Sequence, residues 1–276
     1  MAKRDVSSLT VVVTGAARGI GLATAELLAR LGATVALGDR DTELVREGAE
    51  RIGRGAVAAH LDVTSPASWA SFVTEIGEVG PVDVLVNNAG IMPLGPVLEE
   101  PEAVARAIVD VNLHGVINGT KSFGPGMVER GRGHIVNVAS AMGRIAVAGG
   151  ATYSASKFAV VGFSEATRAE LAPLGVDVSM VLPAVVRTEL AEGISAARGV
   201  KAVTAADVAE VVVSAIRRPQ AELWVPRWVQ PMSRTTGALP RVLQEGIARA
   251  FGADRVISGA DRAARASYEA RVRPPA

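Results

Sequence analysis

A tyrosine and a lysine four residues apart, Tyr153 and Lys157, have the types and spacing that most clearly suggest chemistry. They lie in a segment with helical periodicity, so both side chains share one helix face. A free tyrosine has a pKa of about 10, too high for a general base near neutral pH. A neighbouring ammonium favours the phenolate and lowers that pKa. The pair is therefore a candidate for general acid–base catalysis, and an ordinary exposed helix pair is the alternative.

A serine stands where it could join this pair. Ser140 comes 13 residues before Tyr153 and two residues after the predicted strand 134–138. Ligands bind at the carboxyl ends of parallel strands in open α/β sheets. We therefore expect the Ser140 hydroxyl to hydrogen-bond a substrate carbonyl or hydroxyl.

Glycines follow the first apolar run in the spacing G-x-x-x-G-x-G, at Gly15, Gly19 and Gly21. Glycines permit a tight turn, and the next helix offers free N–H groups and a partial positive charge at its start. This arrangement favours binding of a pyrophosphate, and a turn used only for packing is the alternative.

An acidic residue, Asp39, ends the second apolar run, 24 residues after Gly15. A carboxylate there accepts hydrogen bonds from a ribose 2′-hydroxyl and repels a 2′-phosphate, which favours NAD over NADP. Asp39 could instead cap the helix that follows. Arg18 and Arg40 could each meet a 2′-phosphate, so NADP stays an alternative.

These residues need a scaffold, and the hydrophobic pattern supplies one by alternating short strands with longer helices. Strands are predicted over 9–14, 33–37, 56–61, 82–86, 134–138, 176–182 and 222–225. Helices are predicted over 19–31, 41–52, from Ser65 onward, 101–130 with an interruption near Gly124–Gly126, 151–172 and 205–217. Continuous apolar strands indicate a sheet covered on both faces. The expected fold is a three-layer α/β domain with a Rossmann-type doubly wound parallel sheet of about seven strands. An eight-fold β/α barrel is the alternative.

The composition changes near the C-terminal end. Residues 1–226 are predicted to form the dinucleotide-binding and catalytic domain, and 227–276 an Arg-rich extension. From Arg217 onward the chain has 11 Arg against 5 acidic residues. Apolar residues recur there at helical spacing, at Leu239, Val242, Leu243, Ile247 and Phe251. We expect a helix packed on the domain or at a subunit interface; a lid over the substrate site or a membrane-surface helix are alternatives.

Composition excludes several classes of function. The chain is 49% hydrophobic with a net charge of +1, so it can bury a large core and offers no overall charge for nucleic acid. It has no cysteine, which rules out disulfides and cysteine nucleophiles, and its three histidines are far apart, so no metal site is expected. It has no apolar run of about 18 residues and no signal-peptide pattern, so we expect a soluble, cytoplasmic protein.

Together these motifs resemble the short-chain dehydrogenase/reductase family, over roughly 9–226. The matching segments are Thr14–Gly21, Asp62 within Leu61–Val63, Asn87–Gly90, Asn112 within Val111–Leu113, the set of Ser140, Tyr153 and Lys157, and Pro183–Thr188. The last segment resembles P-G-x-x-x-T but has Ala184 in place of the glycine.

The resemblance implies a catalytic set of Asn112, Ser140, Tyr153 and Lys157. Tyr153 would exchange a proton with the substrate oxygen, which Ser140 positions. Lys157 would lower the tyrosine pKa and bind the nicotinamide ribose, and Asn112 would hold a water through its local backbone. The implied cofactor-binding residues are Gly15, Arg18, Gly19, Ile20, Gly21, Asp39, Arg40, Asp62, Val63, Asn88, Ala89, Gly90, Tyr153, Lys157, Pro183, Val186 and Thr188.

The expected substrate cleft is mostly apolar, from the loop after Gly90, the segment after Ser140 and the stretch 189–201. The candidate substrate residues are Met92, Ser140, Met142, Tyr153 and Leu190. We therefore predict an NAD-dependent oxidoreductase that interconverts a hydrophobic secondary alcohol and its ketone. An NADPH-dependent carbonyl reductase and a non-catalytic NAD(H)-binding regulatory or structural protein are the alternatives. The resemblance also implies a homodimer or homotetramer, with helices 101–130 and 151–172 at the interface.

Overall fold

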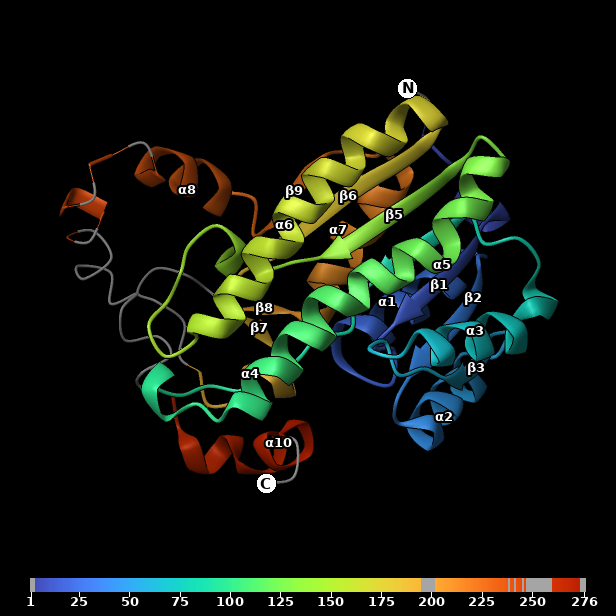
Figure 1. Cartoon of the computed structure of the whole chain (residues 1–276). Helices are drawn as coiled ribbons and strands as arrows, with labels where there is room; N and C mark the ends of the chain where they lie inside the picture. The colour runs from blue at the N-terminus through green and yellow to red at the C-terminus, as the bar shows by residue number, and fades with distance from the viewer. Residues whose placement is uncertain are drawn as a thin grey trace.

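Seven parallel strands form one open sheet in the order β3-β2-β1-β4-β5-β6-β9 (Figure 1). The computed structural model describes residues 3–194, 202–237, 239–240, 242–244, 246 and 260–273. The strands of the sheet are β1 Thr10–Thr14, β2 Thr34–Asp39, β3 Val57–His60, β4 Val84–Asn87, β5 Gly133–Val138, β6 Val176–Pro183 and β9 Glu222–Val225. Two short strands, β7 Val186–Arg187 and β8 Val203–Thr204, pair beside it. The doubly wound sheet is confirmed, and its open edges exclude the barrel.

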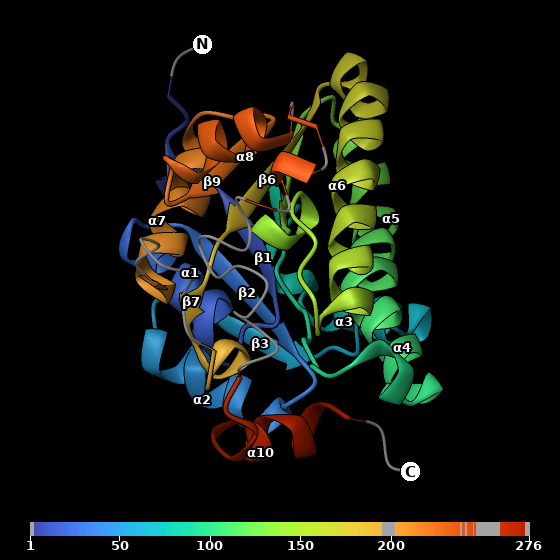
Figure 2. The ribbon, with the colours of Figure 1, turned by 90° about the vertical axis from the view of Figure 1, so that its left-hand side faces the viewer.

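Helices cover both faces of this sheet. The α-helices in the described residues are α1 Gly19–Arg30, α2 Thr42–Ile52, α3 Pro66–Glu75, α4 Glu102–Val109, α5 Gly115–Glu129, α6 Ala151–Leu171, α7 Ala205–Arg217, α8 Val229–Gly237 and α10 Arg262–Val272. Figure 2 shows α1, α2 and α7 on one side of the sheet and α3, α4, α5 and α6 on the other. On the first side the core is aliphatic, and on the second it includes the aromatic rings of Trp69, Phe72 and Phe123, which meet edge to face.

Capping residues and a glycine with positive φ explain where several helices begin and end. Gly32, with φ of 94°, follows the end of α1 in a conformation that glycine favours. Asp41 caps α2 by accepting from the Leu44 amide, and Ser65 caps α3 with Pro66 in its first turn. These signals explain why the predicted boundaries lie within two residues of the observed ones for most elements.

The predicted interruption near Gly124–Gly126 is wrong. Pro125 lies inside α5, on an exposed part of the helix. Proline leaves the carbonyl of Lys121 without its helical donor, but Lys121 is exposed, so water can solvate that carbonyl. The irregular turn lies earlier instead, at the π-helical segment Asp110–His114 between α4 and α5.

The carboxyl ends of β1 and β4 are tied together at one edge of the sheet. The Thr14 hydroxyl accepts from the amides of Asn88 at 3.0 Å and Ala89 at 3.1 Å. This places the glycine turn after β1 directly beside the Asn88–Gly90 loop after β4, so both motifs face one ligand space.

The Arg-rich extension is described in part. α8 follows β9, and Leu239, Val242 and Leu243 are exposed, while Ile247 and Phe251 lie outside the described residues. In Figures 1 and 2 the final helix α10 lies across one end of the molecule, and it contacts the turn Glu189–Ala191. None of the helices in the described residues is long and apolar enough to cross a membrane.

Candidate active site

A cavity of about 990 Å³ opens at the carboxyl edge of the sheet. Of the residues that the sequence suggested, those lining it are Gly15, Arg18, Gly19, Ile20, Asp39, Arg40, Asp62, Val63, Asn88, Ala89, Gly90, Met92, Ser140, Met142, Tyr153, Lys157, Pro183, Val186, Thr188 and Leu190. Gly21 and Asn112 are buried outside this lining. Residues far apart in sequence thus meet around one space of the size that ligand sites have.

The glycine turn forms one end of the cavity. Gly15 and Gly19 have φ of 64° and 57°, in the region that glycine favours. A Cβ on Gly21 would lie only 2.2 Å from the carbonyl oxygen of Gly15. The Asn88 amide donates to the carbonyls of Thr14 and Gly15 at 2.9 and 3.1 Å and so braces the turn. In the described part of the chain no side chain caps the start of α1, which leaves its amides for an anionic ligand.

Carboxylates dominate the cavity at the end of β2. Asp39 accepts from the amides of Ala17 and Asp41, each at 3.0 Å. Asp41 caps α2 and also pairs with Arg18 at 2.5 Å. Arg18 lies 3.4 Å from Glu189 as well. The guanidinium of Arg18 therefore already has two carboxylate partners.

The tyrosine and lysine of α6 are both buried at the middle of the cavity. Tyr153 is 5% exposed and Lys157 is 4% exposed. The Lys157 ammonium lies 5.8 Å from the centre of the Tyr153 ring and donates to the Val138 carbonyl at 3.1 Å. Ser140, just after β5, accepts from the Met142 amide at 3.1 Å, and its hydroxyl acts to lower the pKa of Tyr153. Serine, tyrosine and lysine thus form one cluster.

Burial shifts the pKa values of Tyr153 and Lys157 in the directions that disfavour their charged forms. It raises the pKa of Tyr153 to about 12, against a smaller lowering by the Ser140 hydrogen bond. It lowers the pKa of Lys157 to about 8. The sequence led us to expect a lowered tyrosine pKa, so for this state of the protein the expected direction is wrong. The reason is that desolvation of the buried phenol outweighs the lowering by the Ser140 hydroxyl.

Asn112 joins the wall of the cavity to α6. It lies in the π-helical turn between α4 and α5 and is fully buried. Its amide oxygen accepts from the Ile91 N–H at 2.8 Å, and its NH₂ donates to the Ile91 carbonyl and the Ser156 hydroxyl, each at 3.0 Å. Its side chain therefore holds the loop after β4. A Cβ on Gly90 would lie 3.2 Å from Asn112 Oδ1 and 3.5 Å from Lys157 Nζ, so the glycine lets these groups approach.

The end of the cavity beyond Tyr153 is apolar. Met92, Val104, Ile108 and Tyr153 form a buried cluster, against which Ile91, Leu94, Met142, Leu190 and Ile194 pack. Within the expected stretch 189–201, residues 195–201 lie outside the described residues.

Sequence reasoning did not single out the residues that α10 adds to this cavity. Tyr268, Arg271, Val272 and Arg273 all line it. The start of α10 carries a recognisable signal, because Asp261 caps it by accepting from the amides of Ala263 and Ala264. The small number of tyrosines could also have drawn attention to Tyr268, since the chain has only two tyrosines and both line the cavity.

Comparison with known proteins gives the same picture from an independent direction. The short chain dehydrogenase family model matches residues 9–199. Cyclopentanol dehydrogenase of a Comamonas species is 39% identical over 193 residues, covering 68% of this chain and 77% of that protein. A 3-alpha-(or 20-beta)-hydroxysteroid dehydrogenase of Mycobacterium bovis is 37% identical over 182 residues, covering 66% and 70%.

Solved structures agree with the fold. A short chain dehydrogenase/reductase from Burkholderia phymatum in complex with NAD superposes with a TM-score of 0.77 at 26% identity, over 84% of this chain and 93% of that one. A protein from Beutenbergia cavernae assigned as an NAD(P) dependent gluconate 5-dehydrogenase, with NADP bound at low occupancy, gives 0.71 at 32% identity, over 79% and 95%.

Proposed function

Since the chain belongs to the short-chain dehydrogenase family and is an oxidoreductase acting on CH–OH groups, we propose that it oxidises a hydrophobic secondary alcohol with NAD. The observation that carries this proposal is the buried cluster of Ser140, Tyr153 and Lys157 between a glycine turn and an apolar pocket end.

The residues around the cavity fit a dinucleotide. The glycine turn leaves the start of α1 open to a pyrophosphate, and Asp39 is placed to accept from a ribose hydroxyl. Asp62 and Val63 would contact the adenine side, and Asn88–Gly90, Pro183, Val186 and Thr188 the remainder. Bound there, NAD supplies the hydride acceptor.

The protein contributes the proton path and the positioning. Tyr153 Oη takes the proton of the substrate hydroxyl, and Ser140 Oγ orients the same oxygen. A cationic Lys157, with its ammonium 5.8 Å from the centre of the Tyr153 ring, stabilises the phenolate and thereby offsets the cost of burying it. Asn112 acts through the loop that it holds, by fixing Ile91 and the Tyr153-bearing helix relative to one another. In the ketone-reducing direction the same groups return the proton.

The charge pattern supports NAD rather than NADP. Arg18 has Asp41 and Glu189 as partners, and Arg40 donates to the Arg271 carbonyl. A 2′-phosphate would have to draw these arginines away while approaching Asp39. An NADPH-dependent carbonyl reductase is the second candidate, because Arg18 and Arg40 both line the cavity.

The apolar pocket end supports a hydrophobic substrate. Met92, Met142 and Leu190 offer the side of the substrate away from its hydroxyl only apolar contacts. The names of the relatives from Comamonas and Mycobacterium, cyclopentanol and hydroxysteroid dehydrogenase, agree with a carbinol on an apolar ring.

Two measurements test this function. Calorimetric titration with NADH and with NADPH at one salt concentration should show NADH binding at least roughly tenfold more tightly. Tighter NADPH binding would favour the reductase. An alcohol series with NAD should then give turnover that Tyr153→Phe abolishes while NADH still binds. Near-normal turnover by that variant would refute the role of Tyr153.

We also propose assembly as a homodimer or homotetramer through the outer faces of α4, α5 and α6. Phe158, on α6, is 43% exposed in the single chain and would be covered by such an interface. Light scattering coupled to size-exclusion chromatography should give two or four copies, and Phe158→Glu should lower that number.

A further inference from the structure

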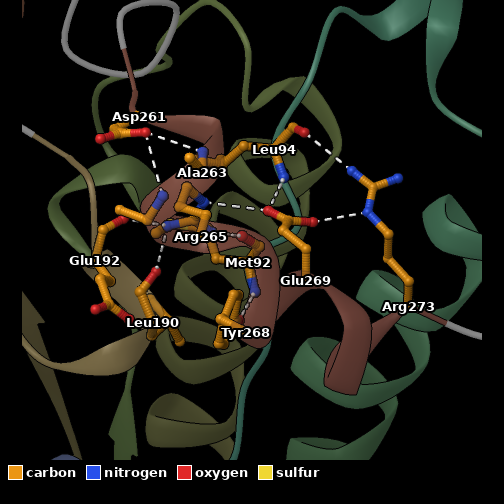
Figure 3. Close-up of polar contacts among 11 residues, drawn as sticks. Met92, Leu94, Leu190, Glu192, Asp261, Ala263, Arg265, Tyr268, Glu269 and Arg273 are labelled. Carbon is orange, nitrogen blue, oxygen red and sulfur yellow. Dashed lines mark hydrogen bonds and ion pairs between the residues drawn. The ribbon is translucent and has the colours of Figure 1, made fainter.

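The last helix, α10, spans the two walls of the cavity. Arg265, only 2% exposed, donates to the Met92 carbonyl at 2.8 Å on the loop after β4. The same guanidinium donates to the carbonyls of Leu190 at 2.9 Å and Glu192 at 3.0 Å on the opposite segment. Figure 3 shows this one side chain reaching both walls. A planar guanidinium suits such a task because its several donors are fixed in one plane.

The next turn of α10 places a tyrosine in the space between those walls. Tyr268 is 4% exposed and lines the cavity. Its hydroxyl accepts from the Met92 amide at 2.7 Å. The guanidinium groups of Arg265 and Arg271 lie 5.0 and 5.8 Å from the centre of its ring. The ring is therefore fixed at its hydroxyl end and flanked by two cations.

A carboxylate locks the same helix in place. Glu269 accepts from the Leu94 amide at 3.3 Å and pairs with Arg265 at 3.1 Å and Arg273 at 2.7 Å. Arg273 in turn donates to the Leu94 carbonyl at 3.1 Å (Figure 3). The N–H and the carbonyl of both Met92 and Leu94 are thus hydrogen-bonded by side chains of residues 265–273. The backbone of this wall is therefore rigid, and it shifts little when a substrate packs against it.

The position of this wall relative to the catalytic cluster gives it a role. Met92, which Tyr268 holds, belongs to the apolar cluster around Tyr153. Tyr268 itself lies outside the residues 9–199 that the family model matches. The common scaffold therefore supplies the chemistry, and the extension supplies this part of the pocket.

We propose that α10 forms the end wall of the alcohol-binding pocket and that Tyr268 is a specificity-determining residue, with Arg265 as the positioning residue that holds it. The ring of Tyr268 limits how far a substrate extends beyond its carbinol carbon. The enzyme then prefers compact secondary alcohols, such as a single small ring, over large or multi-ring ones. This inference rests on the proposed alcohol oxidation.

The test compares cyclopentanol with cyclododecanol at saturating NAD. The Tyr268→Ala variant should raise the ratio of kcat/KM for the large ring over that for the small ring by roughly tenfold or more, the size of effect that pocket contacts give. Tyr268→Phe keeps the ring but loses the hydroxyl that accepts from the Met92 amide, so it should raise the ratio by less than Tyr268→Ala does. Ser267→Ala, at an exposed position on the same helix, is the matched control and should change nothing.

The positioning role of Arg265 has its own readout. Arg265→Lys offers one ammonium in place of a guanidinium fork, so it should raise the same ratio through KM while kcat on cyclopentanol changes little. If Tyr268→Ala does not fold, Tyr268→Leu and Arg265→Lys carry the comparison. An unchanged ratio in folded variants overturns the inference. Absence of turnover by the wild-type enzyme on every alcohol tested refutes the proposed function instead.

Discussion

Replacing the buried lysine should make the protein more stable while it removes activity. Lys157 is 4% exposed, and its ammonium has one hydrogen-bond acceptor, the Val138 carbonyl at 3.1 Å, among the described contacts. Burial lowers its pKa from 10.5 to about 8. At about 1.4 kcal/mol per unit, this shift means that holding the lysine charged costs the folded state about 3 kcal/mol.

Proton linkage gives the direction in which the stability of the folded protein changes with pH. Below pH 8 the lysine is charged in both states, and the folded protein bears the full cost. Between pH 8 and 10.5 the unfolded chain binds more protons, so stability rises with pH. Lys157→Met removes the charge and loses a hydrogen bond of about 1 kcal/mol, for a net gain of about 2 kcal/mol at pH 7.

Urea unfolding of the cofactor-free protein measures this change. At pH 7 the midpoint of Lys157→Met should lie above that of the wild type by about 0.7 M, for a slope of about 3 kcal/mol/M. The gain should shrink as pH approaches 10. Lys121→Met, an exposed lysine of α5, is the control and should follow the wild type at every pH. A variant less stable than the wild type at pH 7, with its pH dependence intact, would refute the burial argument.

Four further outcomes can be checked. The only two tyrosines, Tyr153 and Tyr268, both have a pKa raised by burial. The folded protein should therefore develop ultraviolet phenolate absorbance only well above the pH of about 10 at which the urea-unfolded chain does. Phenolate absorbance at the same pH in both states would contradict this. Burial lowers the pKa of His134 to about 3, so the histidine stays neutral in the fold. Stability should fall as pH drops below about 6.5, by up to about 1.4 kcal/mol per pH unit, and His134→Gln should flatten that slope in urea titrations. Gly21→Ala would press a methyl group onto the Gly15 carbonyl. It should lower stability by about 1–3 kcal/mol and weaken NADH binding, both measurable by thermal shift with and without NADH. Asp39→Ala should reduce the preference for NADH over NADPH in calorimetry by roughly tenfold, and an unchanged preference would show that another group sets it.

Most of the scaffold could be predicted because local signals and global fold agree. The strands are mostly apolar runs, and glycine, serine and aspartate stand between them where turns and caps require those residues. The prediction failed at Pro125. Proline was expected to interrupt the helix, but the sequence does not reveal that this proline lies on an exposed part of the helix. A proline that faces water costs a helix less than one whose orphaned carbonyl is buried.

The residues of the cavity likewise include some that the sequence could suggest and some that it could not. The turn after β1 and the pair on α6 have fixed short-range spacings, so the sequence alone could suggest them. Tyr268 and Arg265 reach the cavity only through tertiary contacts with residues 92–94 and 190–192. The apolar spacing from Leu239 to Leu243 drew attention to side chains that are exposed in the single chain, and it did not single out α10. The direction of the Tyr153 pKa was missed because burial cannot be known before the fold.

The hydrogen bonds between α10 and the loop after β4 join residues 173, 176 and 179 positions apart. Closing so long a segment is entropically costly until the intervening chain has folded. The longest strand pairing of the sheet, Val11 with Val84, joins residues 73 positions apart. The sheet can therefore form first and later serve as the template for α10. During synthesis, too, the helix emerges after every strand of the sheet. A molecule can therefore have its full sheet and glycine turn while its pocket still lacks an end wall, and recovery of substrate preference on refolding should be the slowest signal to return.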